Sequence, residues 1–271
     1  MEPSSPRIPI ITLTTDFGLQ DAYVASMKGV ILGLAPDVRI VDISHEIPHQ
    51  GIVAGGFVLS CAFRHFPAGT IHLLVVDPGV GTSRRLLLAR TESYFFLAPD
   101  NGALGPVFAM EPPREVFHLT ASHYFRPDPS ATFHGRDILA PLAARLARGT
   151  APAHFGEPVT DYLPSPLTPP APQSDGKILL HVIMPDRFGN LILNLRQDEY
   201  HRLVGAALER PFLLEISGRK VSRLLRTYAE GEEREIFALF NSSGYLELAV
   251  RDGSAASELA CGSGATATLS P

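Results

Sequence analysis

Short β-type runs alternate with helix-length apolar segments over the first part of the chain. The run Ile10–Thr14 ends at a turn, and apolar residues then recur at helical spacing. A later run, "TIHLLVVD", is apolar throughout, as expected for a strand covered on both faces. In chain order the predicted elements are strand 10–14, helix 21–36, strand 38–44, helix 51–66 and strand 70–77. This succession predicts an α/β domain with a largely parallel sheet.

A Pro-rich segment separates this pattern from a different one. Asp161–Lys177 contains five prolines, and Pro158 lies just upstream. Such a segment propagates neither helix nor sheet and is typical of a semi-rigid linker. Short β-type runs separated by Gly, Ser and Asn follow, which predicts a small, mostly-β domain. We therefore expect an N-terminal α/β domain over 8–160, a linker over 161–176 and a C-terminal domain over 177–271.

Composition excludes several classes of partner. The 271 residues include 23 basic and 28 acidic side chains, a formal net charge of −5, and form no basic stripe. Nucleic acid is therefore not expected as a partner. No apolar run approaches the ~18 residues that span a bilayer, so no membrane association is expected. Cys61 and Cys261 stand in unrelated contexts and no secretory segment opens the sequence, which favours a cytoplasmic location.

Four polar segments begin where apolar runs end, and ligands of open α/β sheets gather at the carboxyl ends of strands. Asp16 and Asp77 follow their strands directly, so both are expected at one sheet edge. Each segment alone is compatible with ordinary turn or capping chemistry, whereas four together favour a site. The segments are "TTDFGLQD" (14–21), "VDPGVGTSRR" (76–85), "APDNGALG" (98–105) and "FHGRD" (133–137).

The segment Val75–Arg85 is compatible with a structural ion pair, a phosphate-binding loop or half of a catalytic site. The phosphate interpretation is weak, because the glycines match neither GxxxxGK[ST] nor GxGxxG. Asp77, Arg84 and His134 could together hold one water, two of them accepting or steering its protons while the cation stabilises developing hydroxide. Asp16 could accept hydrogen bonds from a diol, because a carboxylate offers two oxygens to two neighbouring hydroxyls.

A metal site is the alternative for "DISHEIPHQ", where His45 and His49 stand four residues apart. Pro48 between them argues against a helix, and the chain has no HExxH motif. We therefore expect no metal ligands here.

Two polar segments of the β domain are compatible with simple turns or with an amino-acid site. "MPDRFGNLILN" places Asp186, Phe188 and Asn190 around a tight turn. "FNSSGYLELAVRDGSAA" supplies serines and backbone amides. In the functional interpretation Asp186 binds an ammonium group and the serines a carboxylate, while Phe188 and Tyr245 offer flat surfaces to a purine.

Taken in order, "TLTTDFG", "VVDPGVGTSRR", "PDNG", "FHGRDILAP", "DRFGN" and "NSSGYLELAV" resemble the S-adenosyl-L-methionine hydroxide adenosyltransferases over nearly the whole chain. The resemblance implies an α/β domain, a β-barrel-like domain, and a homotrimer with active sites between subunits. It implies that water attacks C5′ of S-adenosylmethionine, giving adenosine and L-methionine without a cofactor. Asp77, Arg84 and His134 match the water-activating set, and Asp16 matches the ribose-diol carboxylate. The residues that match the substrate-binding positions are Asp186, Phe188, Asn190, Ser242, Ser243, Tyr245, Glu247 and Val250.

Two other functions remain as alternatives. The fluorinating and chlorinating relatives resemble the chain over "TTDFG" and "FGN" but lack the Asp-Arg-His set. The fluorinating members also carry a tryptophan after "FGN", and this chain has no tryptophan. A non-catalytic protein that binds adenosine or S-adenosylmethionine would need no water-activating residues. The presence of Asp77, Arg84 and His134 favours the hydrolase over both.

Overall fold

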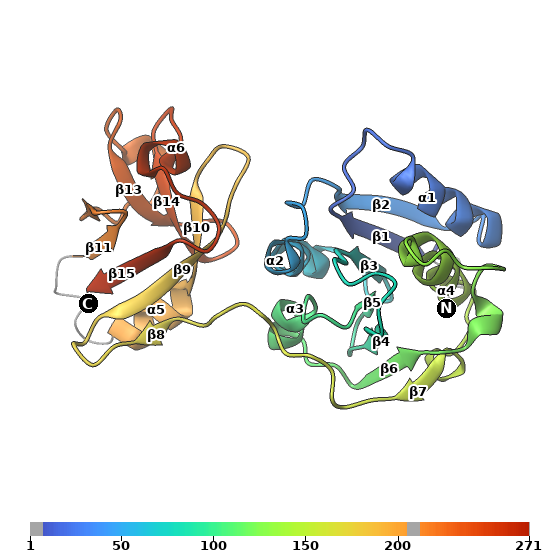
Figure 1. The fold of residues 1–271 in the computed structure, drawn as a ribbon. Coiled ribbons are helices and arrows are strands. Elements are labelled where there is room, and N and C mark those ends of the chain that lie inside the picture. Colours follow the sequence, from blue (N-terminus) through green and yellow to red (C-terminus); the bar gives the residue numbers. More distant parts are fainter. Residues whose placement is uncertain (1–7, 205–211, 271) are drawn as a thin grey trace, which may run out of the picture. The chain divides into compact units, whose positions relative to one another are not determined.

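The computed structural model describes residues 8–204 and 212–270. The chain divides into two compact units, with the boundary between Pro166 and Leu167 (Figure 1). Among the described residues, none of the helices is both long and apolar enough to cross a membrane.

The N-terminal unit is built on a seven-stranded sheet in the order β2-β1-β3-β5-β4-β6-β7. Strands β2, β1, β3 and β5 are parallel, whereas β4, β6 and β7 pair antiparallel. A short link between β4 and β5 permits only a hairpin, and this explains why the parallel pairing stops there. The strands are β1 (Ile10–Thr15), β2 (Arg39–Ser44), β3 (Ile71–Val75), β4 (Leu86–Arg90), β5 (Phe95–Pro99), β6 (Glu115–Leu119) and β7 (Gly156–Pro158).

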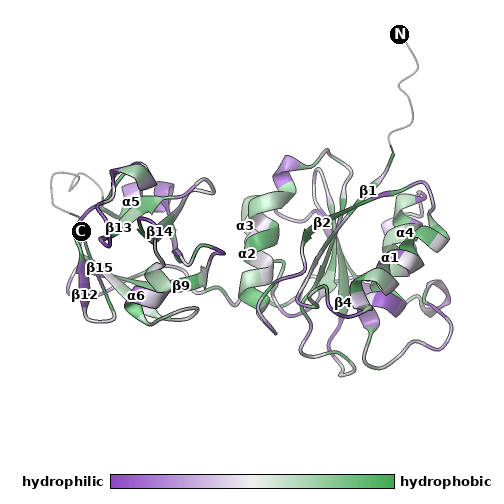
Figure 2. Cartoon of the chain, turned by 90° about the horizontal axis from the view of Figure 1, so that it is seen from above, coloured by the Kyte–Doolittle hydropathy of each residue, from purple (hydrophilic) through white to green (hydrophobic). Residues whose placement is uncertain are grey.

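Helices cover both faces of this sheet, as the apolar β3 run predicts (Figure 1). On one face Met27 and Ile31 of α1 share a buried cluster with Leu13, Leu73 and the α4 side chains. On the other face α2, which is largely apolar (Figure 2), packs against β1 and β3 beside α3. The helices are α1 (Tyr23–Leu34), α2 (Ile52–Ala62), α3 (Gly105–Met110) and α4 (Ala140–Ala147), with single 3₁₀ turns at Phe63–His65, Ser122–Tyr124 and Pro152–His154.

The first residues of the Pro-rich segment belong structurally to the N-terminal unit. The buried carboxylate of Asp100 accepts a hydrogen bond from the Leu163 backbone N–H at 2.8 Å. Gly102 and Gly105 lie so close to Pro164 and Ser165 that neither glycine has room for a Cβ atom. Residues 161–166 therefore form a strap held against the end of β5.

The C-terminal unit is an antiparallel, barrel-like sheet in the order β12-β11-β15-β9-β10-β14-β13. A bridge between Leu224 and Ala238 brings the chain after β12 beside β13 and nearly closes the barrel. Both parts of the predicted fold class are confirmed. The strands are β8 (Ala171–Pro172), β9 (Ile178–Pro185), β10 (Leu191–Arg196), β11 (Leu213–Ile216), β12 (Arg219–Val221), β13 (Ile236–Phe240), β14 (Tyr245–Val250) and β15 (Thr266–Ser270), with helices α5 (Gln197–Val204) and α6 (Ala255–Leu259) and a 3₁₀ turn at Tyr228–Glu230.

Strand β8 lies within the segment expected to form no sheet. Ala171 and Pro172 pair antiparallel with β9, at the margin of the barrel. An edge strand tolerates proline because its N–H groups need not all enter a ladder.

Candidate active site

Asp77, Arg84 and His134 meet in the N-terminal unit. Nε of Arg84 donates to both carboxylate oxygens of Asp77 at 2.9 Å, and Nη2 makes a further close contact with Oδ2. Nη2 also lies 2.8 Å from Nδ1 of His134. The Asp77 and Arg84 side chains are only 7% and 12% exposed, so the ion pair is largely withdrawn from water. The structure thus joins three side chains that the sequence separates by up to fifty-seven positions.

The glycine-rich turn between Asp77 and Arg84 is held by its own hydrogen bonds. The Thr82 hydroxyl donates to the Gly79 carbonyl at 2.7 Å and accepts from the Arg84 backbone N–H at 3.3 Å. Gly81 has a φ of +80°, and a Cβ there would lie 2.5 Å from the Ala131 carbonyl oxygen. The turn therefore packs tightly against the loop that carries His134.

Replacing Gly81 by alanine should lower both stability and activity. The substitution forces a β-carbon into the left-handed region and against a backbone carbonyl, which we expect to cost about 1–3 kcal/mol. Thermal unfolding and steady-state kinetics would measure both effects. Gly149→Ala is a matched control, since φ is +90° there but nothing lies within 4 Å of the added carbon. Equal activity losses in the two variants would contradict the tight packing at Gly81.

The contact with Arg84 assigns the tautomer of His134. A guanidinium has only donors, so Nδ1 of the imidazole accepts and the neutral ring carries its proton on Nε2. Burial lowers the pKa of His134 below the ordinary 6.5 and the Arg84 charge lowers it further, against the opposing effects of Asp77 and Asp137. At neutral pH His134 therefore presents an Nε2–H donor rather than a free basic nitrogen.

The activity should persist as the pH falls through 6.5. Because the folded-state pKa of His134 is depressed, the ring stays neutral there and protonates only at lower pH, where kcat/KM should fall. The unfolded chain binds this proton near the ordinary pKa of 6.5. The free energy of unfolding therefore decreases as the pH falls from about 6.5 to the lower folded-state pKa of His134. A histidine-selective NMR titration would give the pKa, and a value for His134 of 6.5 or higher would contradict the assignment.

Arg85 has different partners from Arg84. Its Nε donates to Asp100 at 2.8 Å, and its Nη1 donates to Asp161 at 2.7 Å. These contacts fasten the strap of residues 161–166 to the end of β5. The two neighbouring arginines therefore contact different side chains. In the sequence, only their positions in the family motif distinguished them.

Asp137 of the "FHGRD" segment is structural. It is buried and accepts hydrogen bonds from Arg126, Arg136 and the backbone N–H of Ser130. The hydrogen bond from Arg136 is the main cause of a lowered pKa for this carboxyl, against the effect of burial. The neighbouring Gly135 packs close to Val75 of β3, since a Cβ would lie 3.2 Å from a Val75 methyl. Together these contacts seat His134 at the end of β3.

Asp16 lies at the same sheet edge as Asp77. Thr15 of β1 pairs with Val75 of β3. Asp16 is therefore one residue beyond this pair, and Asp77 is two residues beyond it. Oδ2 of Asp16 accepts from the Gln50 backbone N–H at 2.9 Å. Asp16 lines a hollow of about 420 Å³ between residues 16–21 and 45–49.

The two histidines of the metal alternative are placed differently. Both line the Asp16 hollow, but His45 is buried and contacts Thr15, whereas His49 is exposed. Within residues 8–204 and 212–270, no three His, Cys, Asp or Glu side chains gather as metal ligands would.

A hollow of about 1030 Å³ opens on the barrel-like unit and collects most of the predicted substrate-binding residues. Phe188 is 77% exposed beside it. Tyr228 and Arg251 also line it. Sequence reasoning missed Tyr228 because it belongs to no recognised motif, and assigned no role to Arg251 although it lies within the segment that follows Phe240. Ser243 and Tyr245 are not among the lining residues. The predicted residues that do line it are Asp186, Phe188, Asn190, Ser242, Glu247 and Val250.

Asp186 organises the turn that carries Phe188. Its Oδ1 accepts from the backbone N–H groups of Phe188 and Asn190, both at 2.8 Å, and its Oδ2 accepts from the Asn190 amide at 2.9 Å. A carboxylate has about four acceptor positions, so roughly one stays open to a ligand. Asp186 thus shapes the turn and still presents negative charge to the hollow.

Glu247 is a buried carboxylate in the wall of this hollow. It is 2% exposed and accepts from the Tyr228 hydroxyl at 2.7 Å and the Asn241 amide at 3.0 Å. Burial raises its pKa, against the effect of these two hydrogen bonds. Tyr245 of the same strand instead lies under the Arg196 guanidinium, 5.4 Å from ring to cation, and is only 8% exposed. The aromatic residues that line the hollow are therefore Phe188 and Tyr228 rather than Tyr245.

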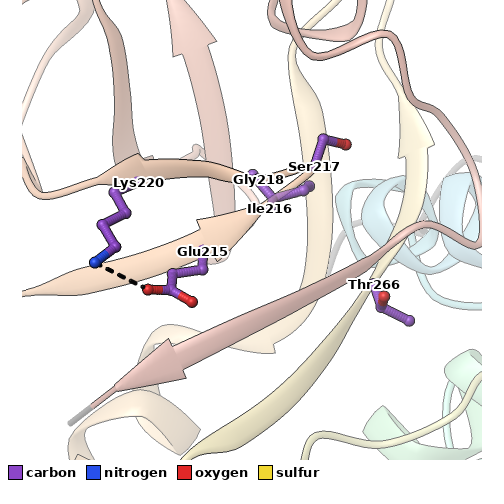
Figure 3. A pocket seen from close by; sticks show the side chains of 6 residues that line it. All are labelled: Glu215, Ile216, Ser217, Gly218, Lys220 and Thr266. Carbon is purple, nitrogen blue, oxygen red and sulfur yellow. Dashed lines mark ion pairs between the residues drawn. The ribbon is translucent and has the colours of Figure 1, made fainter.

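A smaller hollow on the β11–β12 hairpin does not compete with these sites (Figure 3). Glu215 and Lys220 in its lining form an ion pair at 3.5 Å, which leaves little net charge to attract a ligand. At about 200 Å³ it is also much smaller than the hollow beside Phe188.

An α/β unit with a charged sheet edge and a barrel-like unit with a hollow of mixed apolar and charged lining define a two-domain, ligand-binding protein. Family models match both units: the SAM hydroxide adenosyltransferase N-terminal domain over residues 11–156 and the corresponding C-terminal domain over 180–268. The chain belongs to the SAM hydroxide adenosyltransferase family.

Similar proteins cover nearly the full chain. A Salinispora tropica protein named (R)-S-adenosyl-L-methionine hydrolase is 38% identical over 92% of both chains. A fluorinase from an Actinoplanes species is 27% identical over 89% of this chain and 90% of its own. The crystal structure of an uncharacterized conserved protein from Thermotoga maritima superposes with a TM-score of 0.86 at 30% identity, covering 98% of this chain and all of the other.

Proposed function

We propose that this chain hydrolyses S-adenosyl-L-methionine to adenosine and L-methionine. The observation that carries the proposal is the direct contact of Asp77 and His134 with Arg84 in a member of this family. The water oxygen forms a bond to C5′, the C5′–sulfur bond breaks, and its electron pair stays on sulfur as the methionine thioether. One proton leaves the attacking water.

The three side chains have separable roles in this reaction. Within the part of the chain that the structure describes, Arg84 Nη1 and His134 Nε2 have no hydrogen-bond partner, so their N–H groups are free to hold the water oxygen. The Asp77 carboxylate accepts one proton of the water as its oxygen bonds to C5′, and the Arg84 and His134 donors stabilise the hydroxide character that develops on this oxygen. Catalysis then consists mainly of positioning and charge stabilisation, since the sulfonium is already a good leaving group.

The substrate-binding roles are part of the same proposal. Asp16 accepts the ribose hydroxyls, supported by its place at the sheet edge that carries Asp77. The hollow of the barrel-like unit binds the remainder of the substrate, with Asp186 facing the ammonium group and Phe188 covering the purine. Its mixture of an exposed phenyl ring with carboxylate, amide and hydroxyl groups suits an amino acid joined to a nucleoside.

Isotope-labelled water tests the reaction directly. Incubation with S-adenosylmethionine in ¹⁸O-water should place the label in the 5′-hydroxyl of adenosine, as seen by mass spectrometry. Binding without turnover would support the non-catalytic alternative. A 5′-halogenated nucleoside as the main product in chloride or fluoride would support the halogenase alternative.

We further propose that the enzyme is a cytoplasmic homotrimer that needs no cofactor, with active sites completed between subunits. Membership of the family over both units supports this proposal. Light scattering would give the mass of the assembly, and a stable monomer with full activity would contradict this proposal. Full activity after dialysis against a chelator is expected.

A further inference from the structure

A row of polar side chains extends from Thr15, the neighbour of Asp16, to helix α1. The Thr15 hydroxyl is 2.9 Å from Nδ1 of His45, and Nε2 of His45 is 3.1 Å from Oδ1 of Asp42. Lys28 donates to Oδ2 of Asp42 at 2.6 Å. Thr15 is fully buried and His45 is 4% exposed. The row joins β1, β2, the loop after β2 and helix α1.

The donor and acceptor roles along this row of side chains can be assigned. Burial raises the pKa of Asp42, but the hydrogen bond from Lys28 and the nearby His45 lower it overall, so Asp42 is a carboxylate. Nε2 of His45 lies close to this carboxylate without making a hydrogen bond to it. A carboxylate beside Nε2 favours the tautomer with its proton there, and Nδ1 is then free to accept from the Thr15 hydroxyl. Oγ1 of Thr15 in turn accepts from the Phe17 backbone N–H at 3.3 Å. The row therefore fixes the backbone on both sides of Asp16.

Backbone contacts from the same loop complete this arrangement. The carbonyl of His45 accepts from the Gly18 N–H at 2.8 Å, and the Gln50 N–H donates to Asp16 Oδ2. Among the contacts of the described residues, Oδ1 of Asp16 has none, so this oxygen is open to a ligand. The loop that begins at His45 thus holds the Asp16 turn in place.

We infer that His45 is a positioning residue that sets the angle at which Asp16 meets the ribose diol, with Asp42 orienting its imidazole. The inference rests on the proposed function, because it assigns Asp16 to the substrate. It gives the buried His45 a role in substrate binding. A purely structural histidine would affect stability but not the discrimination between a diol and a single hydroxyl.

Strand β1 provides a matched control. Thr12, which is also fully buried, contacts Nδ1 of His72 at 2.7 Å. His72 stacks on Phe96 at 5.1 Å, within the layer covered by α2. Burial lowers its pKa to about 3, so the ring stays neutral. Thr12→Val and Thr15→Val therefore each remove one buried threonine–histidine contact, but only Thr15 adjoins Asp16.

The test compares these two variants on S-adenosylmethionine and on its 2′-deoxy analogue. For Thr15→Val we expect KM for the natural substrate to rise about tenfold with kcat changed less than about threefold, and the preference for the diol to fall by about tenfold. Thr12→Val should lose thermal stability to a similar degree with an unchanged preference. His45→Asn, whose side-chain oxygen can replace Nδ1, should recover part of the preference that His45→Ala loses.

The outcomes separate the two proposals. If the wild-type enzyme releases adenosine but both threonine variants keep the same diol preference, the inference about His45 is overturned and the function stands. If the wild-type protein gives no turnover, the proposed function fails. Calorimetric binding of adenosine and 2′-deoxyadenosine to the same variants then decides the inference, and wild-type protein that does not distinguish these ligands would overturn it.

Discussion

Arg84→Lys should lower kcat by about 10²- to 10³-fold, the size of effect seen when one donor to a developing oxyanion is removed. Lysine keeps the charge but cannot donate to both Asp77 oxygens and to His134 at once, because it lacks the planar fork of guanidinium. Quenched assays of adenosine release would measure the loss. KM should change little, since the group acts on the water rather than on the bound substrate.

Arg85→Lys is the matched control for this variant. It makes the same chemical change one residue along, at the ion pairs with Asp100 and Asp161. We expect kcat within about threefold of wild type and a lower melting temperature, because one of the partners is a buried carboxylate. Equal losses of kcat in the two variants would contradict the assignment of Arg84 to the water site.

His134→Asn should lower kcat about 10²-fold, whereas His134→Gln should retain more activity. The asparagine oxygen can accept from Arg84 as Nδ1 does, but its side chain is too short to supply the Nε2–H donor. Glutamine reaches the position of Nε2 and can donate from there. Single-turnover kinetics of both variants would measure the chemical step apart from product release.

The order of these two variants decides the role of His134. Greater activity in the asparagine variant would mean that His134 serves to hold Arg84 and does not touch the water. Activity equal to wild type in both would remove His134 from the mechanism.

Local patterns in the sequence were sufficient for the alternation of strands and helices and for the change of architecture after the Pro-rich segment. The antiparallel end of the first sheet was not predicted. The segments "LLLAR" (86–90) and "YFFLAPD" (94–100) have the composition of strands, but composition does not distinguish parallel from antiparallel pairing. Only the short link between them determines that they pair antiparallel. The pairing of Ala171 and Pro172 with β9 was missed for a related reason. Proline content predicts where a ladder is interrupted, but not that an edge strand can accept two more residues.

The candidate site was predictable only in part. Resemblance to a family placed Asp77, Arg84 and His134 together, whereas spacing alone could not show that they meet. Tyr228 was missed because its neighbours carry no motif, and its approach to Glu247 depends on how the barrel closes. His45 drew attention as a possible metal ligand, and its contact with Thr15 depends on the parallel pairing of β1 with β2. Such contacts follow from tertiary structure rather than from local sequence.

The strap of residues 161–166 affects how the two units can be produced separately. A fragment ending at residue 160, where the α/β pattern stops in the sequence, would lose the Asp161 partner of Arg85 and the Leu163 N–H bound to Asp100. The buried carboxylate of Asp100 would then keep its contact with Arg85 but lose the hydrogen bond from Leu163. An N-terminal fragment that preserves the native environment of this edge must therefore extend to Pro166. The boundary between the two units lies inside the Pro-rich segment rather than before it.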